Sequence, residues 1–151
     1  GFDTVMDGKA LEGALNALRS QDYTVIMLDT AGSDDPLVTA AITASDLCLI
    51  PARPTMADLE ATQPTILAIQ SLKKPFAFIL NQSPVQGIRR VSEATDGVRL
   101  FGVLAEPPVA MRTDHQDAVG QGQGVTEFNP NGKAAEEIRG LWRWIAKKLK
   151  G

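Results

Sequence analysis

The sequence predicts an α/β protein with three layers, in which helices flank a mostly parallel sheet. Apolar runs without polar alternation, such as residues 23–28 and 76–80, are typical of strands that are covered on both faces. Segments with apolar residues at helical spacing, such as 133–150, separate or follow these runs. Because strands and helices alternate along the chain, we expect parallel strands joined by helical crossovers.

The composition limits the class of protein. A chain of 151 residues, 44% hydrophobic and 22% charged, suffices for one globular domain with a buried core. The net charge of −3 does not indicate a nucleic-acid binder, although it allows a local basic patch. Only one cysteine, Cys48, and one histidine, His115, are present, so we expect neither an internal disulfide nor a zinc cluster.

The expected cellular setting also follows from the sequence. A single cysteine fits a reducing compartment, and the first residues lack the pattern of a secretory signal. No apolar run approaches the roughly 20 residues that span a bilayer. We therefore expect a cytoplasmic protein without a membrane span.

Helices and strands are expected in regular alternation. The expected helices are residues 9–19, 36–44, 57–72, 88–95, 112–119 and 133–150. The expected strands are residues 23–28, 47–50, 76–80 and 98–104. Pro51 should close the second strand, because a central strand could not contain proline. Pro64 should kink or reset the third helix, because proline removes an interior hydrogen bond.

A carboxylate follows the first expected strand. Asp29 ends the apolar run, and residues 30–32 are small enough for a turn. Open α/β sheets bind ligands beyond the carboxyl ends of their strands, so Asp29 is a candidate functional residue. The alternative is that Asp29 caps the helix beginning near Pro36, although Asp34 and Asp35 are better placed to do so.

Other strand ends carry residues suited to a ligand. Pro51, Asn81 and the pair Glu106–Pro107 should lie with Asp29 along one edge of the sheet, where a nucleotide-sized ligand could rest. Asn81 offers both a donor and an acceptor, which suits recognition of a base edge. Asn81 could instead serve only as a turn residue before Ser83, and the spacing leaves both roles open.

Several of these motifs together resemble the ParA/MinD-type ATPases, deviant P-loop proteins that partition plasmids and chromosomes. The run 23–32 is similar to the Walker B segment of that family. The resemblance continues in order through residues 47–51, 76–82, 111–112, 117–118, 124–127 and 129–138. It covers about Leu11 to the end of the chain, with plasmid-type ParA as the nearest variant. Each motif is weak alone, and their order and spacing make the resemblance specific.

The resemblance implies a P-loop NTPase fold, with ATP and magnesium as cofactors. In an intact site Asp29 would organise magnesium through its water, and Thr30 would support it in catalysis. The residues implied to hold adenine are Asn81, Glu106, Pro107 and Pro108.

The resemblance also implies partners. ATP would drive formation of a homodimer that binds DNA nonspecifically, with a ParB-like adaptor as a further partner. Arg112 matches a position where the family carries an arginine and is the first candidate for DNA contact. Arg89 and Arg90 are weaker candidates, and all three could simply be solvated surface arginines.

One family motif is missing. No G-x-x-x-x-G-K-[ST] phosphate loop occurs: Lys133 is followed by Ala134 instead of a hydroxyl residue, and Glu127 replaces the first glycine. We therefore expect a single ParA-like domain over residues 1–151, truncated before its Walker A loop and inactive by itself as an ATPase. Without that loop's strand, segment 23–28 would expose an edge, so we expect either a rearranged sheet or a dimer joined there.

Two further classes of function stay open. The chain could be a non-catalytic interaction or dimerisation module derived from this fold. Trp142 and Trp144 cannot both face the core, because residues two apart point to different sides of a helix, and an exposed tryptophan suits an interface. An aspartic protease is the third class, since Asp29–Thr30 follows two apolar residues, but such enzymes need a second carboxylate that shares a proton.

Overall fold

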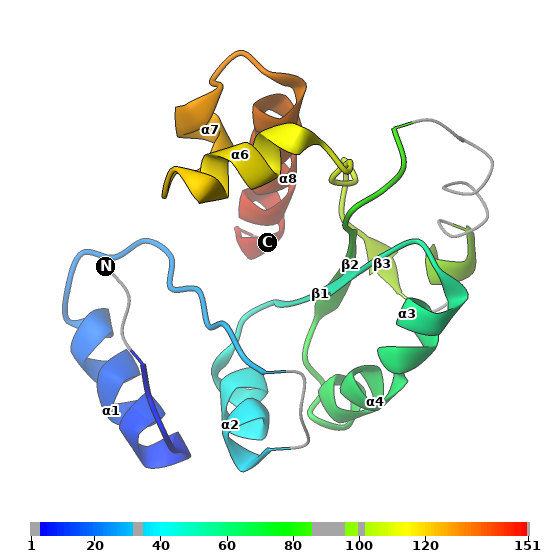
Figure 1. Cartoon of the computed structure of the whole chain (residues 1–151). Coiled ribbons are helices and arrows are strands. Elements are labelled where there is room, and N and C mark those ends of the chain that lie inside the picture. The colour runs from blue at the N-terminus through cyan, green and yellow to red at the C-terminus, as the bar shows by residue number, and fades with distance from the viewer. Residues whose placement is uncertain (1–3, 32–34, 86–95, 100–101, 151) are drawn as a thin grey trace.

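A three-stranded parallel sheet lies at the centre of the computed structural model, which describes residues 4–31, 35–85, 96–99 and 102–150 (Figure 1). The strands are β1 (Cys48–Ala52), β2 (Phe76–Leu80) and β3 (Val103–Leu104), in that spatial order. Cys48 of β1 pairs with Phe76 of β2, and Ala77 of β2 pairs with Val103 of β3. The expected α/β class with a parallel sheet is confirmed.

Helices account for most of the remaining described chain. They are α1 (Gly8–Arg19), α2 (Pro36–Ala44), α3 (Met56–Ala61), α4 (Gln63–Ser71), α6 (Thr113–Gly120), α7 (Val125–Phe128) and α8 (Lys133–Leu149). Residues 96–99 are also helical. Among the described helices, none combines the length and the apolar character needed to cross a membrane.

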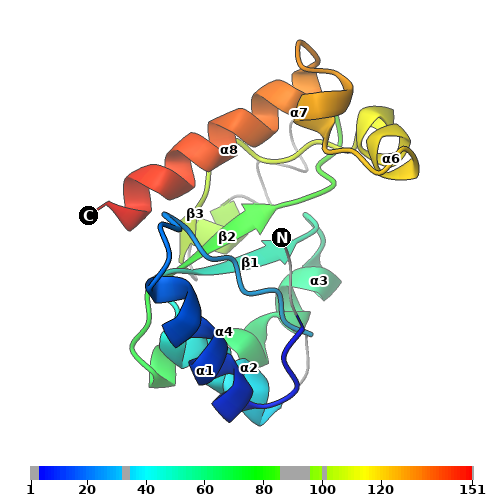
Figure 2. The same cartoon turned by 90° about the vertical axis from the view of Figure 1, so that its left-hand side faces the viewer.

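The two faces of the sheet have separate apolar cores. Alternate residues of a strand point to opposite faces, so Phe78 and Leu80 pack on one side while Ile79 packs on the other. The first core joins the sheet to α2 and α4 through Ile42, Ile50, Ile66, Ile69, Phe78, Leu80, Val98 and Leu104. The second joins the sheet to α8 through Ala105, Val109, Leu141 and Ile145. Figure 2 shows α8 crossing one face, with α2 and α4 on the other, which makes the three layers.

Local signals explain where several helices begin. The side chain of Asp7 accepts a hydrogen bond from the Ala10 N–H at 2.8 Å, which caps α1. Asp35 caps α2 in the same way, at 2.7 Å from the Leu37 N–H, with Pro36 as the first helical residue. The expected helix over 57–72 is divided into α3 and α4 just before Pro64, as the missing N–H of proline requires.

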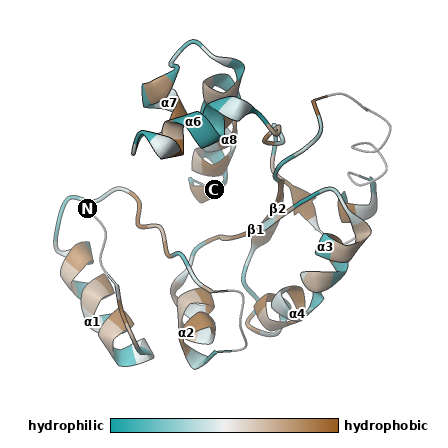
Figure 3. Ribbon diagram, in the orientation of Figure 1, coloured by the Kyte–Doolittle hydropathy of each residue, from teal (hydrophilic) through white to brown (hydrophobic). Residues whose placement is uncertain are grey.

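The prediction of a strand over residues 23–28 is wrong. The segment joining α1 to α2 passes the open side of β1 without entering the sheet (Figures 1 and 2). Figure 3 shows apolar residues along this segment, and Tyr23, Val25, Ile26 and Met27 are exposed. Leu28 alone of this run packs on the cluster formed by α1 and α2. Apolar composition produces a strand only where another strand supplies hydrogen bonds, and here none does.

The expected end of the second strand is also corrected. Pro51 lies within β1, opposite Ile79 of β2. The hydrogen bonds that join the ends of β1 to β2 use the N–H of Cys48 and the C=O of Ala52. Pro51 is an odd number of residues from both, so its nitrogen faces the open edge, where a missing N–H breaks no ladder bond.

The expected strand over 98–104 is largely wrong. Residues 96–99 are helical, and only Val103 and Leu104 pair with β2. Val98 is fully buried in the first core, so its apolar character serves helix packing. The expected helix over 88–95 lies outside the described residues.

Hydrogen exchange tests the unpaired segment. We expect the amides of Val25 and Ile26 to exchange rapidly, because they have no ladder partner, whereas those of Phe78 and Leu80 should be protected by pairing and burial. Amide-resolved exchange by NMR provides the measurement. Equal protection of the two segments would contradict the absence of a strand at 23–28.

Candidate nucleotide site

Asn81 lies directly after β2, at the carboxyl edge of the sheet. Its N–H donates to the Ala52 carbonyl at 2.9 Å, which joins it to the end of β1. Its side-chain Oδ1 accepts from the Gln82 N–H at 2.9 Å, and Gln82 has a φ of 51°. The carboxamide oxygen therefore stabilises the turn, while no described residue hydrogen-bonds its NH₂ group. The turn role and the recognition role proposed for Asn81 are compatible.

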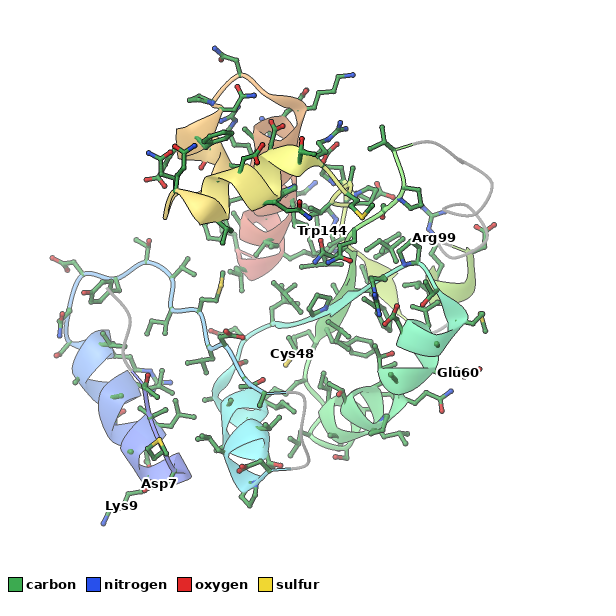
Figure 4. All side chains as sticks on the ribbon, in the orientation of Figure 1. Asp7, Lys9, Cys48, Glu60, Arg99 and Trp144 are labelled. Atoms are coloured by element: carbon green, nitrogen blue, oxygen red, sulfur yellow. The ribbon has the colours of Figure 1, made fainter. Side chains whose placement is uncertain are left out.

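The turn 106–108 is held at the same end of the sheet. The Ala105 N–H donates to Phe78 and the Val109 N–H donates to Leu80, each at 2.8 Å, so the loop runs alongside β2. Glu106 forms an exposed ion pair with Arg99 at 3.1 Å. Arg99 lies on the side of the molecule away from α1 (Figure 4).

Pro107 is positioned by helix α8. A Cβ atom added at Gly140 would lie 2.8 Å from the Cδ of Pro107, closer than packed side chains allow. Gly140 thus permits the turn to lie directly against α8. The structure brings Asn81 and the turn 106–108 to one end of the sheet, as the strand-end argument predicts.

Asp29 and Thr30 do not share this arrangement. Both are exposed, in the segment that stays outside the sheet, so Asp29 does not follow a strand. Their catalytic and magnesium-binding roles stay predictions. Among the described residues, no three His, Cys, Asp or Glu side chains come together as a metal site.

The described residues fit only part of a bound Mg-ATP. A carboxamide and a proline-rich turn suit the base, but binding of the phosphates requires a loop of backbone N–H groups and a lysine. The sequence has no such lysine loop. The arrangement is therefore suited to binding a base and not to phosphoryl transfer.

Arg112 is tied to α8 by an ion pair. Its Nε and Nη2 donate to Glu137 Oε1 at 3.1 and 2.6 Å, and both side chains are about one-fifth exposed. Glu137 Oε2 also accepts from the Ala110 N–H at 3.2 Å. The hydrogen bond from the guanidinium to Glu137 raises the pKa of Arg112 above its already high usual value. Arg112 is thus a structural link, with only part of its guanidinium free for a DNA phosphate.

The remaining expected DNA contacts, Arg89 and Arg90, lie outside the described residues. An open hollow of about 440 Å³ lies beside Arg112, where α6 and α8 begin. Its lining residues are Val85, Met111, Arg112, Thr113, Asp114, Asn129, Gly132 and Lys133. The hollow does not include Asn81 or the turn 106–108, so it is separate from the candidate base site.

Local sequence does not reveal the partners that position the site. Glu137 lies 25 residues from Arg112 in the sequence, and Gly140 contacts Pro107 only through the fold. No local motif marks such pairs. Ser83 is a further residue that no motif marks: its Oγ is buried and has no hydrogen-bond partner in the described part of the chain.

Cys48 behaves as an inert residue. It lies in β1 and packs against the first core (Figure 4). Burial raises the pKa of its thiol, and nearby Lys74 opposes this effect. A raised pKa lowers the fraction of reactive thiolate, in agreement with the expected structural role.

Comparison with solved structures shows what this fold is similar to. The cell division ATPase MinD of Pyrococcus furiosus superposes with a TM-score of 0.75 over 93% of this chain, at 16% sequence identity. The chain spans 59% of the length of that MinD structure. The likeness shows a fold of the ParA/MinD type. No protein-family model and no curated protein matches the sequence.

The Glu137 link makes a prediction about stability. We expect Glu137→Gln to lower the free energy of unfolding by about 1–3 kcal/mol, because it weakens a charge-assisted bond between two partly buried groups. Glu136→Gln is the matched control, since Glu136 is exposed on the same helix and should change stability by less than about 0.5 kcal/mol. Urea unfolding measures both, and equal effects would contradict the link.

Proposed function

We propose that the chain is a ParA/MinD-like partitioning protein that binds the adenine of ATP at Asn81 and the turn 106–108. The observation that carries the proposal is the meeting of these residues at the carboxyl end of a parallel sheet. Ligands of open α/β sheets bind at this end. The similarity in fold to a cell division ATPase supports the same assignment.

The chemistry of the residues suits adenine. The free NH₂ group of Asn81 can donate to a ring nitrogen, while its oxygen is held by the Gln82 N–H. Pro107 and Pro108 offer apolar surface for the face of a base, and Gly140 allows the turn to be held close to α8. A few fixed polar groups beside apolar surface are typical of small-molecule sites.

We further propose that this chain by itself does not hydrolyse ATP. Phosphate binding in P-loop proteins depends on a glycine-rich loop and its lysine, and the sequence contains neither in the required order. Asp29 and Thr30 would then serve magnesium and catalysis only in a site whose phosphate loop is supplied in addition to these residues.

The proposed partners are a second copy of the chain, nonspecific DNA and a ParB-like adaptor, in the cytoplasm. Arg112 is the first candidate for a phosphate, through the part of its guanidinium that Glu137 leaves free, with Arg89 and Arg90 in addition. Contact with phosphates should make DNA binding weaken steeply as salt increases.

Calorimetric titration with Mg-ATP tests the adenine site. We expect measurable binding that Asn81→Ala weakens about tenfold or more, because the substitution removes the donor to the base. Asn131→Ala is the control, since Asn131 is exposed in the turn before α8 and should bind as the unmodified chain does. The absence of binding heat, or equal binding by both variants, would overturn the assignment.

A second candidate function is a non-catalytic interaction or dimerisation module. One observation favours it: β1 has an open edge, and the nearby segment 23–28 carries exposed apolar side chains without a strand partner. Unpaired edges and extended apolar segments pair readily with another chain. The exposed segment of one copy would add to the edge of the other.

Light scattering of the purified chain tests this dimer. We expect a dimer that Met27→Glu dissociates, because the charge would enter an apolar contact. Met56→Glu is the matched control, since the two methionines are 75% and 70% exposed and Met56 lies on α3. A monomer at high concentration, or equal effects of the two substitutions, would rule out this dimer.

A further inference from the structure

The second half of α8 carries a strong positive charge. Residues 139–150 contain five cations and no carboxylate, although the whole chain has a net charge of −3. The five cations are Arg139, Arg143, Lys147, Lys148 and Lys150. The positive charge is therefore concentrated at one end of the molecule.

Three of these cations form one outward face. Arg143, Lys147 and Lys150 follow one another at spacings of four and three, so they lie along the same side of the helix. All three are exposed, while Leu141 and Ile145 bury the opposite side of α8 in the second core. We call these three residues the basic face. Within the described part of the chain, no carboxylate forms an ion pair with any of them.

The remaining two cations have partners. Arg139 donates a hydrogen bond to the Pro130 carbonyl. Lys148 lies 5.4 Å from the centre of the Trp144 ring, which itself packs between α8 and the sheet (Figure 4). The basic face thus contains the cations of this helix that have no intramolecular partner among the described residues.

Trp142 adds an aromatic side chain at the border of the basic face. It is 43% exposed and immediately precedes Arg143. Figure 2 shows that the carboxyl-terminal end of α8 extends beyond the strands. A long ligand could therefore reach the basic face and Trp142 without contacting the rest of the sheet.

We propose that the basic face and Trp142 bind the phosphate backbone of a nucleic acid. The proposal rests on nucleic acid being a partner in the proposed function, but it places the contact away from Arg112 and requires no nucleotide. The face extends about 10 Å, from the helical rise of 1.5 Å per residue. Duplex DNA presents a charge about every 1.7 Å of its axis, enough to engage all three cations together. Trp142 could stack on an unpaired base.

A helix-dipole effect and a membrane surface each account for less of the pattern. Cations in a last helical turn favour the helix dipole, which explains Lys147 and Lys148 but not Arg143, because the dipole effect is limited to the last turn. A membrane surface would require an apolar stripe for insertion. The apolar stripe of α8 is already packed on the sheet, which leaves mainly Trp142 and Leu149 exposed.

Salt-dependent binding of a labelled 20-base-pair duplex tests the proposal. The variant Arg143→Gln/Lys147→Gln/Lys150→Gln should weaken binding at least tenfold at 50 mM salt. It should also flatten the slope of log K against log salt by about 2.7, or 0.9 for each lost phosphate contact. The control Lys9→Gln/Arg19→Gln/Lys73→Gln changes the net charge equally at exposed sites outside α8 and should leave both quantities unchanged. Circular dichroism should show both variants folded.

A single-stranded 20-mer tests the role of Trp142. We expect Trp142→Ala to weaken this ligand about tenfold and the duplex much less, because only unpaired bases can stack on the ring.

Several outcomes would overturn the proposal. Equal losses in the α8 variant and its control would assign the effect to net charge, and loss with Arg112→Gln alone would leave DNA binding but move it from α8. Binding of vesicles containing phosphatidylserine without binding of nucleic acid would assign the face to a membrane. The calorimetric titration with ATP reports separately on the proposed nucleotide site.

Discussion

The ladder between β1 and β2, and the burial of β2 on both faces, are the constraint on which the other elements depend. Leu80 is completely buried, and its neighbour Ile79 points into the opposite core. A strand of apolar residues can hold this place only if helices cover both of its sides. The packing of α2 and α4 on one face and of α8 on the other follows from that requirement.

The same strand positions the candidate base site. Beyond β3, the backbone continues to donate hydrogen bonds to β2, from Ala105 to Phe78 and from Val109 to Leu80. This places the turn 106–108 beside Asn81. The Glu137 carboxylate then joins the following residues, Ala110 and Arg112, to α8. The site is therefore held by a strand and a helix, although the residues that would touch a ligand lie in loops.

Much of this fold could be predicted from the sequence, for identifiable reasons. β2 and α2 have the predicted bounds, because an uninterrupted apolar run and a proline preceded by aspartate are strong local signals. Segment 23–28 has a similar apolar run and forms no strand, because strand formation depends on a partner that local sequence does not specify. Val98 falls in a predicted strand for a related reason, since burial in a helix and burial in a strand require the same residue types.

The candidate site was predictable in part. Asn81 and the turn 106–108 meet because parallel strands end at one edge of a sheet, a rule that needs only the order of the elements. The partners Glu137 and Gly140 depend on how α8 lies across the sheet, and no spacing rule provides this. Asp29 shows the converse: its predicted role depends on a strand before it, and the structure has no strand there.

The most direct test of a nucleotide site at this edge is an amide-resolved NMR titration with Mg-ATP. We predict that the shifted amides cluster at Asn81, Gln82, Glu106 and Val109, around the ends of β2 and β3. Shifts confined to the groove between α1 and α2, or to the hollow beside Arg112, would contradict a base site at this edge, as would a spectrum that does not change.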